Sequence, residues 1–257
     1  MRGGRRSSGR CRAGSAYPGE VYEERPARLA GAVVWRREPG AAADAADPGT
    51  RPVLPDGCMD LIWADGRLLV AGPDTRAYVP RSPAAQYAGV RFAPGEAAGV
   101  LGVEASAVRD ERVELAELWG PRVARRLADR VSGAADRAAA LEDLVLRRAA
   151  DAPAPDPLLR AVVARLRAGL PVGTAADELG IGVRQLHRRS LAAFGYGPKT
   201  LARILRLQRA LALVTAGVPA AEAAPRAGCV DQAHLAREMR ALTGLTIGGY
   251  VAGLRSA

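Results

Sequence analysis

The sequence contains few cysteines and no long apolar segment, and both absences limit what the protein can be. Its three cysteines, Cys11, Cys58 and Cys229, lie far apart in a chain of 257 residues. No pair of them has the spacing of a zinc or redox motif, and an odd number argues against a disulfide framework. No apolar run approaches the roughly 18 residues of a transmembrane helix. A soluble cytoplasmic protein is therefore expected.

Histidine is scarcer still. The two histidines, His187 and His234, both lie in the last third of the chain, so the first half cannot form a histidine-based metal site, which speaks against a cupin-type metalloenzyme. No nucleophile–base pair, metal cluster or phosphate-binding loop stands out in the sequence. We therefore expect no enzyme, no cofactor and no metal site.

Positive charge is concentrated at the two ends of the chain. Of the net charge of +10, residues 1–16 contribute +5, residues 17–155 contribute −3 and residues 156–257 contribute +8. A positive segment beside a weakly negative one favours a polyanionic partner such as nucleic acid for the positive segment. The first 16 residues lack the apolar region of a secretory signal and are predicted to be a disordered basic tail.

Residues 17–150 are predicted to form a β-rich sensor or dimerisation domain with a helical C-terminal part. Asp65-Gly66 separates two apolar runs, residues 58–63 and 67–71, which is a strong signal for a β-hairpin. A further strand is expected over residues 86–92, before the period of the apolar residues changes.

Helical spacing begins at Pro121 and continues, after a break, over residues 134–148. Residues 151–157 contain three prolines, which cannot continue a helix, and are predicted to be a domain linker. Residues 158–257 are predicted to be helical throughout. The expected fold class is α+β, with a small β-rich, cupin-like domain plus helices followed by an all-α domain.

An internal duplication in the C-terminal part is the strongest signal. Residues 176–190 recur in modified form as residues 224–239, each copy with a small alanine and a glycine four residues later. The alanine lets two helices cross closely, and the glycine ends the first helix in a left-handed conformation. A second helix then begins, capped in the second copy by Asp231. This is the pattern of a helix-turn-helix motif, whose second helix enters the DNA major groove.

A long helix is predicted between the two copies, from Pro198 to about Thr215. Its length of about 27 Å follows from the rise of about 1.5 Å per residue. That length approaches one turn of DNA, about 34 Å. One chain can therefore present two recognition helices to successive major-groove segments on one face of a duplex.

Further residues of the C-terminal part follow a known pattern. They are Ala176, Gly180, Leu186-His187-Arg188, Phe194-Gly195, Pro198-Lys199, Arg203, Arg206-Leu207, Gly228, Asp231-Gln232, Leu235, Arg237, Gly244, Thr246 and Tyr250. With them, about residues 158–254 resemble the AraC/XylS family of bacterial transcription regulators. The resemblance implies a double helix-turn-helix domain and a sequence-specific transcription regulator.

The chain departs from that family pattern in its core. The family usually has Phe where this chain has Ser190, Cys229, Leu235 and Met239, and Pro where it has Ile247. Loss of an aromatic side chain at Ser190 is expected to weaken packing by about 1–3 kcal/mol unless neighbours repack. Pro225 falls in the first helix of the second motif, where an interior proline removes a hydrogen bond. These departures put the rigidity of the second motif in question.

Candidate DNA-contacting residues follow from the helical positions. Arg184, His187 and Arg188 lie at i, i+3 and i+4, so one face of the first recognition helix carries all three. Arginine can fork onto guanine or hold a phosphate, so Arg188 can serve either sequence readout or positioning alone. The full set of candidates is Arg184, Gln185, His187, Arg188, Gln232, Ala233, His234, Arg237, Lys199 and Arg203.

The first half of the chain also resembles the N-terminal domain of a subset of regulators. The matching pieces are residues 54–62, 70–73, 89–95 and 118–120. That family domain is poorly characterised, so the resemblance implies a β-rich sensor fold and names no ligand. Asp56, Asp60 and Trp63 are candidates for a ligand pocket, against the alternative of a turn acid, an edge acid and a core aromatic.

Double-stranded DNA is the expected partner. RNA polymerase, a small-molecule effector and a second copy of the chain are further candidates. Two other readings stay open at this point. One is a small-molecule enzyme whose C-terminal part acts as a tether, and the other is a degenerate adaptor that kept the fold without binding DNA.

Overall fold

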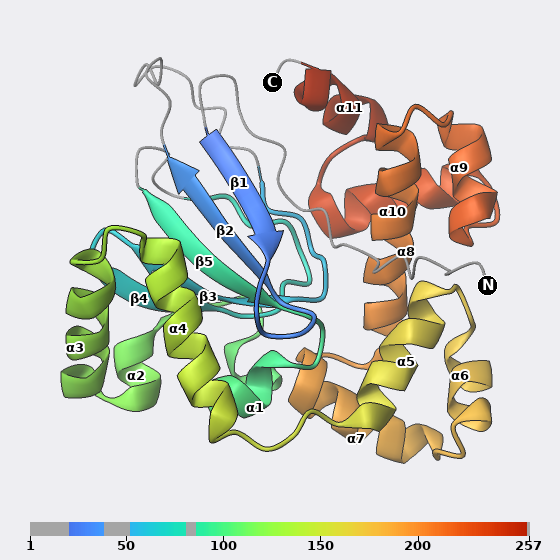
Figure 1. The fold of residues 1–257 in the computed structure, drawn as a ribbon. Helices are drawn as coiled ribbons and strands as arrows, with labels where there is room; N and C mark the ends of the chain where they lie inside the picture. The colour runs from blue at the N-terminus through green and yellow to red at the C-terminus, as the bar shows by residue number, and fades with distance from the viewer. Residues whose placement is uncertain (1–20, 39–51, 81–85, 256–257) are drawn as a thin grey trace, which may run out of the picture.

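Six strands form one antiparallel sheet in the computed structural model, which describes residues 21–38, 52–80 and 86–255 (Figure 1). The strands are β1 (Val21–Pro26), β2 (Val33–Glu38), β3 (Met59–Ala64), β4 (Arg67–Ala71), β5 (Tyr87–Phe92) and β6 (Arg112–Glu114). Their order across the sheet is β1-β2-β5-β3-β4-β6. Asp65 and Gly66, between β3 and β4, both have positive φ, as the predicted two-residue hairpin turn requires.

Helices cover one face of this sheet. Along β3, Met59, Leu61 and Trp63 are buried and alternate with less buried residues, because successive side chains of a strand point to opposite faces. The three buried side chains share an apolar core with residues of the covering helices. These helices are α1 (Ala97–Leu101), the 3-10 helix η1 (Ala105–Val108), α2 (Leu115–Trp119), α3 (Pro121–Ser132) and α4 (Arg137–Ala150).

The rest of the described chain is helical. It comprises α5 (Pro157–Arg167), α6 (Val172–Glu178), α7 (Val183–Phe194), α8 (Pro198–Thr215), α9 (Ala220–Ala227), α10 (Gln232–Thr243) and α11 (Ile247–Arg255). α8 is the long helix that the sequence predicts, and its Leu201, Ile204, Leu207 and Ala210 are fully buried. Because α5, α6, α7, α9 and α10 all contact it, α8 is the central rod of this helical part (Figure 1).

The predicted duplication folds as two helix-turn-helix motifs, α6–α7 and α9–α10. Gly180 and Gly228 both have positive φ in the turns, the conformation for which the sequence pattern selects glycine. Asp231 caps α10 as predicted, since its Oδ1 accepts a hydrogen bond from the His234 amide at 2.6 Å.

The α+β class is confirmed, with strands in the first part of the described chain and helices alone after residue 156. The described strands form one sheet with β1 and β6 at its two edges. The tail at residues 1–16 lies outside the described residues. Residues 151–157 join α4 to α5, with Asp156 capping the helix that Pro157 begins. Among the described residues, no helix combines the length and the apolar character needed to cross a membrane.

The departures from the family pattern are absorbed in different ways. Leu235, Met239 and Cys229 are all buried in the apolar core of the helical part, so the second motif is packed without the aromatic side chains. Pro225 lies inside α9, in the last turn of the helix, and is exposed to solvent. Ser190 is fully buried, and its hydroxyl has no hydrogen-bond partner among the described residues.

The sheet part and the helical part meet along a surface that we call the junction. At its centre lies the loop that precedes β3. Leu54 of this loop packs against the apolar core of the helical part. The carbonyl oxygen of Pro55 accepts a hydrogen bond from Nε2 of Gln208, on α8, at 2.7 Å. The loop is therefore fastened to the central rod.

Two further contacts of the junction reach the motifs themselves. The amide of Ala77, after β4, donates to the carbonyl of Leu242 at the end of α10, at 3.0 Å. Arg109, after η1, donates from Nη1 to the carbonyl of Gly195 at the end of α7, at 3.2 Å. The sheet part thus touches α8 and the C-terminal ends of both second helices.

We predict that Ser190→Ala raises the free energy of unfolding by about 1 kcal/mol or more, because it removes a buried hydroxyl that has no partner. Urea denaturation measures the change. Ser132→Ala is the matched control, since the Ser132 hydroxyl accepts from Trp63 Nε1 at 2.9 Å and donates to the Ala128 carbonyl at 2.7 Å. The control should lower stability, and a similar loss in Ser190→Ala would contradict the prediction.

Candidate nucleic-acid interface

The N-terminal half of α7 presents the first set of candidate residues to solvent. Arg184, Gln185, His187 and Arg188 are all exposed, whereas Leu186 between them is buried in the core. The arrangement follows from the helix period, since residues three and four apart share a face. The C-terminal end of α7 faces the junction instead, so the sheet part leaves the N-terminal half open.

The second set lies on α10. Gln232, Ala233 and Arg237 are exposed, while Leu235 is buried. His234 differs from the other candidates because its ring turns back toward the protein. Its Nδ1 accepts the Val230 amide at 3.2 Å, and its Nε2 lies 3.8 Å from Oε1 of Glu238. The structure therefore places His234 at the edge of the surface that the other three form.

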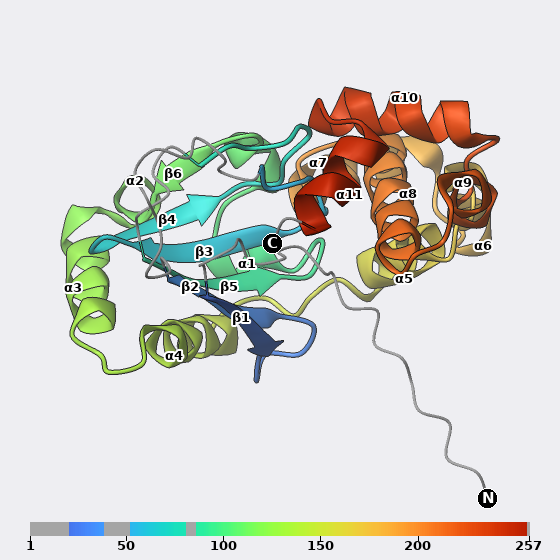
Figure 2. The ribbon, with the colours of Figure 1, turned by 90° about the horizontal axis from the view of Figure 1, so that it is seen from above.

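The two recognition helices lie on the same side of α8. In Figure 1, α7 is at one end of α8 and α10 crosses its other half. Figure 2, the view turned by 90°, shows both helices above α8. The requirement drawn from the duplicated sequence, two short exposed helices held on one side of a rod, is therefore met.

The basic residues of α8 divide into exposed and internal ones. Lys199 is exposed at the start of the helix. Arg203 is only partly exposed, and its Nε lies 3.0 Å from Oε1 of Glu238 on α10; Arg206 reaches the other oxygen of the same carboxylate at 3.5 Å. Glu238, a residue that the sequence analysis did not single out, thus ties α10 to α8.

Arg209 has a structural role. Its Nη1 donates to the carbonyls of Leu166 and Arg167 at 2.7 and 2.9 Å, and its Nη2 donates to the carbonyl of Ala227 at 2.8 Å. These carbonyls end α5 and α9, where the last turn lacks intrahelical partners. Arg209 therefore joins three helices.

The candidate ligand pocket of the sheet part is only partly assembled. Asp56 and Asp60 come together around Arg91, whose Nε lies 3.5 Å from Asp56 Oδ2 and 3.3 Å from Asp60 Oδ1. Trp35 Nε1 donates to Asp60 at 2.7 Å. These groups are buried, and the carboxylates have charged or hydrogen-bonding partners as buried charges require.

Trp63 does not join this cluster. It lies on the opposite, helix-covered face of the sheet from Asp60, because the residues are three apart on one strand. Its Nε1 donates to Ser132 on α3. The expectation that all three residues line one pocket is therefore wrong.

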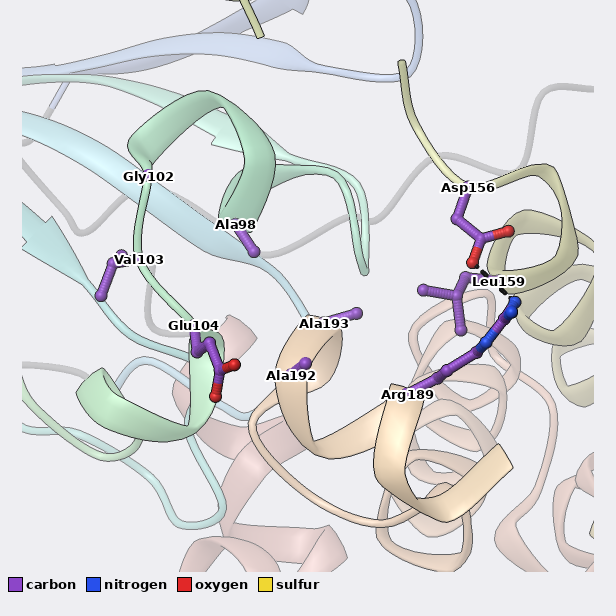
Figure 3. Close-up of a pocket in the computed structure, with 9 residues that line it drawn as sticks. All are labelled: Ala98, Gly102, Val103, Glu104, Asp156, Leu159, Arg189, Ala192 and Ala193. Carbon is purple, nitrogen blue, oxygen red and sulfur yellow. Dashed lines mark hydrogen bonds and ion pairs between the residues drawn. The ribbon is translucent and has the colours of Figure 1, made fainter. Parts of the chain in front are cut away.

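A cavity opens at the junction instead. It has a volume of about 430 Å³ and is lined by Ala98, Gly102, Val103, Glu104, Asp156, Leu159, Arg189, Ala192 and Ala193. Figure 3 shows these residues arriving from α1 and the segment after it, from the start of α5, and from the C-terminal half of α7. Arg189 closes one side through its ion pair with Asp156 at 3.1 Å. The cavity therefore adjoins the first recognition helix on its inner side.

Comparison with known families decides what the helical part is. Residues 175–253 match the profile of a helix-turn-helix domain. Residues 175–253 form an AraC-type helix-turn-helix domain. The AraC-type domain covers α7, α8 and α10, which carry the exposed residues described above. The resemblance drawn from the sequence is confirmed over this range.

The sheet part also matches a known domain family, but one without an assigned function. Residues 32–114 match a domain of unknown function (DUF6597), in agreement with the poorly characterised N-terminal domain expected from the sequence. No curated protein matches the chain.

Solved structures of ToxT from Vibrio cholerae are distantly similar. ToxT from strain O395 is 9% identical with a TM-score of 0.45, and the match covers 80% of this chain and 94% of ToxT. ToxT bound to (E)-4-(8-methylnaphthalen-1-yl)but-3-enoic acid is 10% identical with a TM-score of 0.46, over 92% and 100% of the two chains. At this level the likeness carries no weight for the ligand or DNA site of this chain.

We predict that Arg209→Ala lowers the free energy of unfolding by at least about 1.5–3 kcal/mol, the size of one lost hydrogen bond to a charged group. Arg184→Ala is the matched control, because Arg184 is exposed on α7. Urea denaturation of both variants measures the difference. Equal stability of Arg209→Ala and the unsubstituted chain would show that the three carbonyl contacts contribute nothing.

Proposed function

We propose that the protein is a sequence-specific transcription regulator that reads two successive major-groove segments through α7 and α10. The observation that carries the proposal is the exposure of both sets of polar and basic residues on one side of α8. The rod is about 27 Å long, which approaches one turn of DNA, about 34 Å. Because chromosomal DNA lies in the cytoplasm of a bacterial cell, we expect the protein to act there.

The proposed contacts divide into two kinds. Arg184, Gln185 and Arg188 on α7, and Gln232, Ala233 and Arg237 on α10, would meet base edges, since arginine and glutamine pair with guanine and adenine and a methyl group meets thymine. Lys199 and His187 would hold phosphates. Arg203 would join them only by giving up Glu238. The surplus of fourteen basic over six acidic residues in residues 156–257 supports the electrostatic part of binding.

We further propose that residues 17–150 sense a small-molecule effector or a partner and that residues 158–257 bind DNA, with residues 151–157 as the linker. Support comes from the junction. Arg91 of β5 holds Asp56, and the next residue back, Pro55, accepts the hydrogen bond of Gln208 on α8. A ligand that moves this loop would therefore move the rod that spaces the two recognition helices. RNA polymerase and a second copy of the chain are further partners that we propose for such a regulator.

The observations favour a regulator over the two other readings. The adaptor reading depended on a weakened core, yet Leu235 and Met239 close the core of the second motif. The enzyme reading finds no support in the helical part, because residues 175–253 match a helix-turn-helix domain. We therefore propose that the chain is not an enzyme.

The DNA-binding prediction is tested with two substitutions on separate helices. Genomic fragments retained by the purified full-length chain supply the binding site, and fluorescence anisotropy then measures affinity. Arg188→Ala and Arg237→Ala should each weaken binding by about 1–3 kcal/mol, the size of one arginine contact to a base. Arg122→Ala, exposed on α3 of the sheet part, should change nothing.

The outcome against the proposal is specific. If no fragment is preferred at low salt, or if Arg188→Ala binds as tightly as Arg122→Ala, then α7 does not read DNA. For a specific complex held by several phosphates, affinity should also fall linearly with salt on a double logarithmic scale.

A second prediction concerns the junction. The double variant Leu54→Ala, Gln208→Ala removes the apolar contact and the hydrogen bond that fasten the loop to α8. All three tryptophans lie in residues 35–119, so tryptophan fluorescence reports on the sheet part, whereas circular dichroism reports on all helices. The two signals should unfold at separate urea concentrations in the variant and at one concentration in the unsubstituted chain. Coincident transitions in the variant would argue against a role of this loop in coupling.

A further inference from the structure

The turn of the second motif brings together three side chains of the types that bind metal ions. Cys229 lies in the turn, and His234 and Glu238 lie one helical turn apart on α10. One ligand atom from each, a sulfur, an imidazole nitrogen and a carboxylate oxygen, all lie within 4.8 Å of one another. Among the described residues, no other group of three His, Cys, Asp or Glu side chains has its ligand atoms this close together.

We propose that Cys229, His234 and Glu238 bind a divalent metal ion of the borderline class, such as Zn²⁺. A thiolate, an imidazole and a carboxylate form a donor set that zinc accepts, and hard cations such as Mg²⁺ do not favour thiolate. Three protein ligands leave a fourth tetrahedral position for water. His234 is only half-buried, so the site has access to solvent.

The geometry needs only side-chain adjustment. Bond lengths of about 2.0–2.3 Å to zinc imply ligand atoms about 3.3–3.6 Å apart in a tetrahedron. His234 Nε2 and Glu238 Oε1 are already 3.8 Å apart. All three residues belong to one turn and the helix that follows it, so the backbone that holds them is a single rigid unit.

Protons and charges balance in the proposed step. Only a deprotonated thiol binds a metal ion, so the Cys229 thiol releases its proton to solvent on coordination. In the metal-free protein Nδ1 of His234 accepts the Val230 amide. Coordination through Nε2 moves the ring proton to Nδ1, and rotation of the His234 ring leaves the exposed Val230 amide to bind water. The thiolate and the Glu238 carboxylate then neutralise the divalent ion.

Metal binding would compete with the contacts that fix α10. Glu238 now accepts Arg203 at 3.0 Å and Arg206 at 3.5 Å. A metal ion on Oε1 takes the position that Arg203 occupies, and Arg203, which is partly exposed, is released toward solvent. The ion would therefore replace one link between α8 and α10 and fasten the turn directly to the recognition helix.

Cobalt(II) is the probe for this site, because a thiolate bound to Co²⁺ gives a charge-transfer absorption band that oxygen and nitrogen ligands do not give. The full-length chain carrying Cys11→Ser, freed of metal by a chelator, is titrated with Co²⁺. We expect the band to saturate at one ion per chain and to disappear when Zn²⁺ is added. Cys229→Ser should abolish the band, and Cys58→Ser, which replaces the other buried cysteine, should retain it.

A second variant keeps the test decisive if Cys229→Ser does not fold. His234→Asn removes a ligand at a half-buried position and should weaken Co²⁺ binding by about tenfold or more, since even residues that only orient a ligand affect affinity by that factor. Absence of the band at saturating Co²⁺, or a band that survives Cys229→Ser, would overturn the proposal. These measurements use no DNA, so their outcome is independent of the proposed regulator function.

Discussion

The burial of α8 is the constraint on which the helical part depends. Its apolar stripe is enclosed by five other helices, so none of them can shift without exposing part of it. Burial alone is non-directional, however, and would permit neighbouring helices to slide or rotate. Directed polar contacts from the same helix remove that freedom. Arg209 fixes the ends of α5 and α9, and Arg203 and Arg206 fix α10 through Glu238.

This division of roles changes how the basic residues of the domain are understood. The positive net charge of the domain suggests that its arginines bind DNA. The three arginines of α8, however, contact groups within the protein: Arg203 and Arg206 contact Glu238, and Arg209 contacts backbone carbonyls. The arginines of α7 and α10 that face solvent, with Lys199, remain available to a polyanion. Charge on the rod therefore organises the domain, and charge on the recognition helices is available for binding. Glu238 stands between the two sets, and the proposed metal site would draw on the same carboxylate.

The sheet part is placed where it can influence both motifs. Its contacts reach α8 through Pro55, the end of α10 through Ala77 and the end of α7 through Arg109. None of these contacts covers the N-terminal half of α7. A regulator built in this way can change the spacing or orientation of its recognition helices while both remain open to DNA. The buried Arg91 with its two aspartates would transmit a change in the sheet to the loop that holds α8.

Several features follow from the sequence because they depend on neighbours in the chain. The hairpin at Asp65-Gly66, the helix from Pro198 to Thr215, the cap at Asp231 and the duplicated motif are each encoded within a few residues, by backbone preferences and by the helical period. The exposure of Arg184 and Arg188 follows from the same period. By contrast, the tertiary structure alone decided that Asp60 meets Arg91 and that Trp63 meets Ser132. It also decided that Arg209 is internal and that Cys229 meets His234 and Glu238. The reason is physical: a local pattern specifies which face of an element is apolar, but the partner of a polar side chain is set by which other element packs there, and that depends on the whole core.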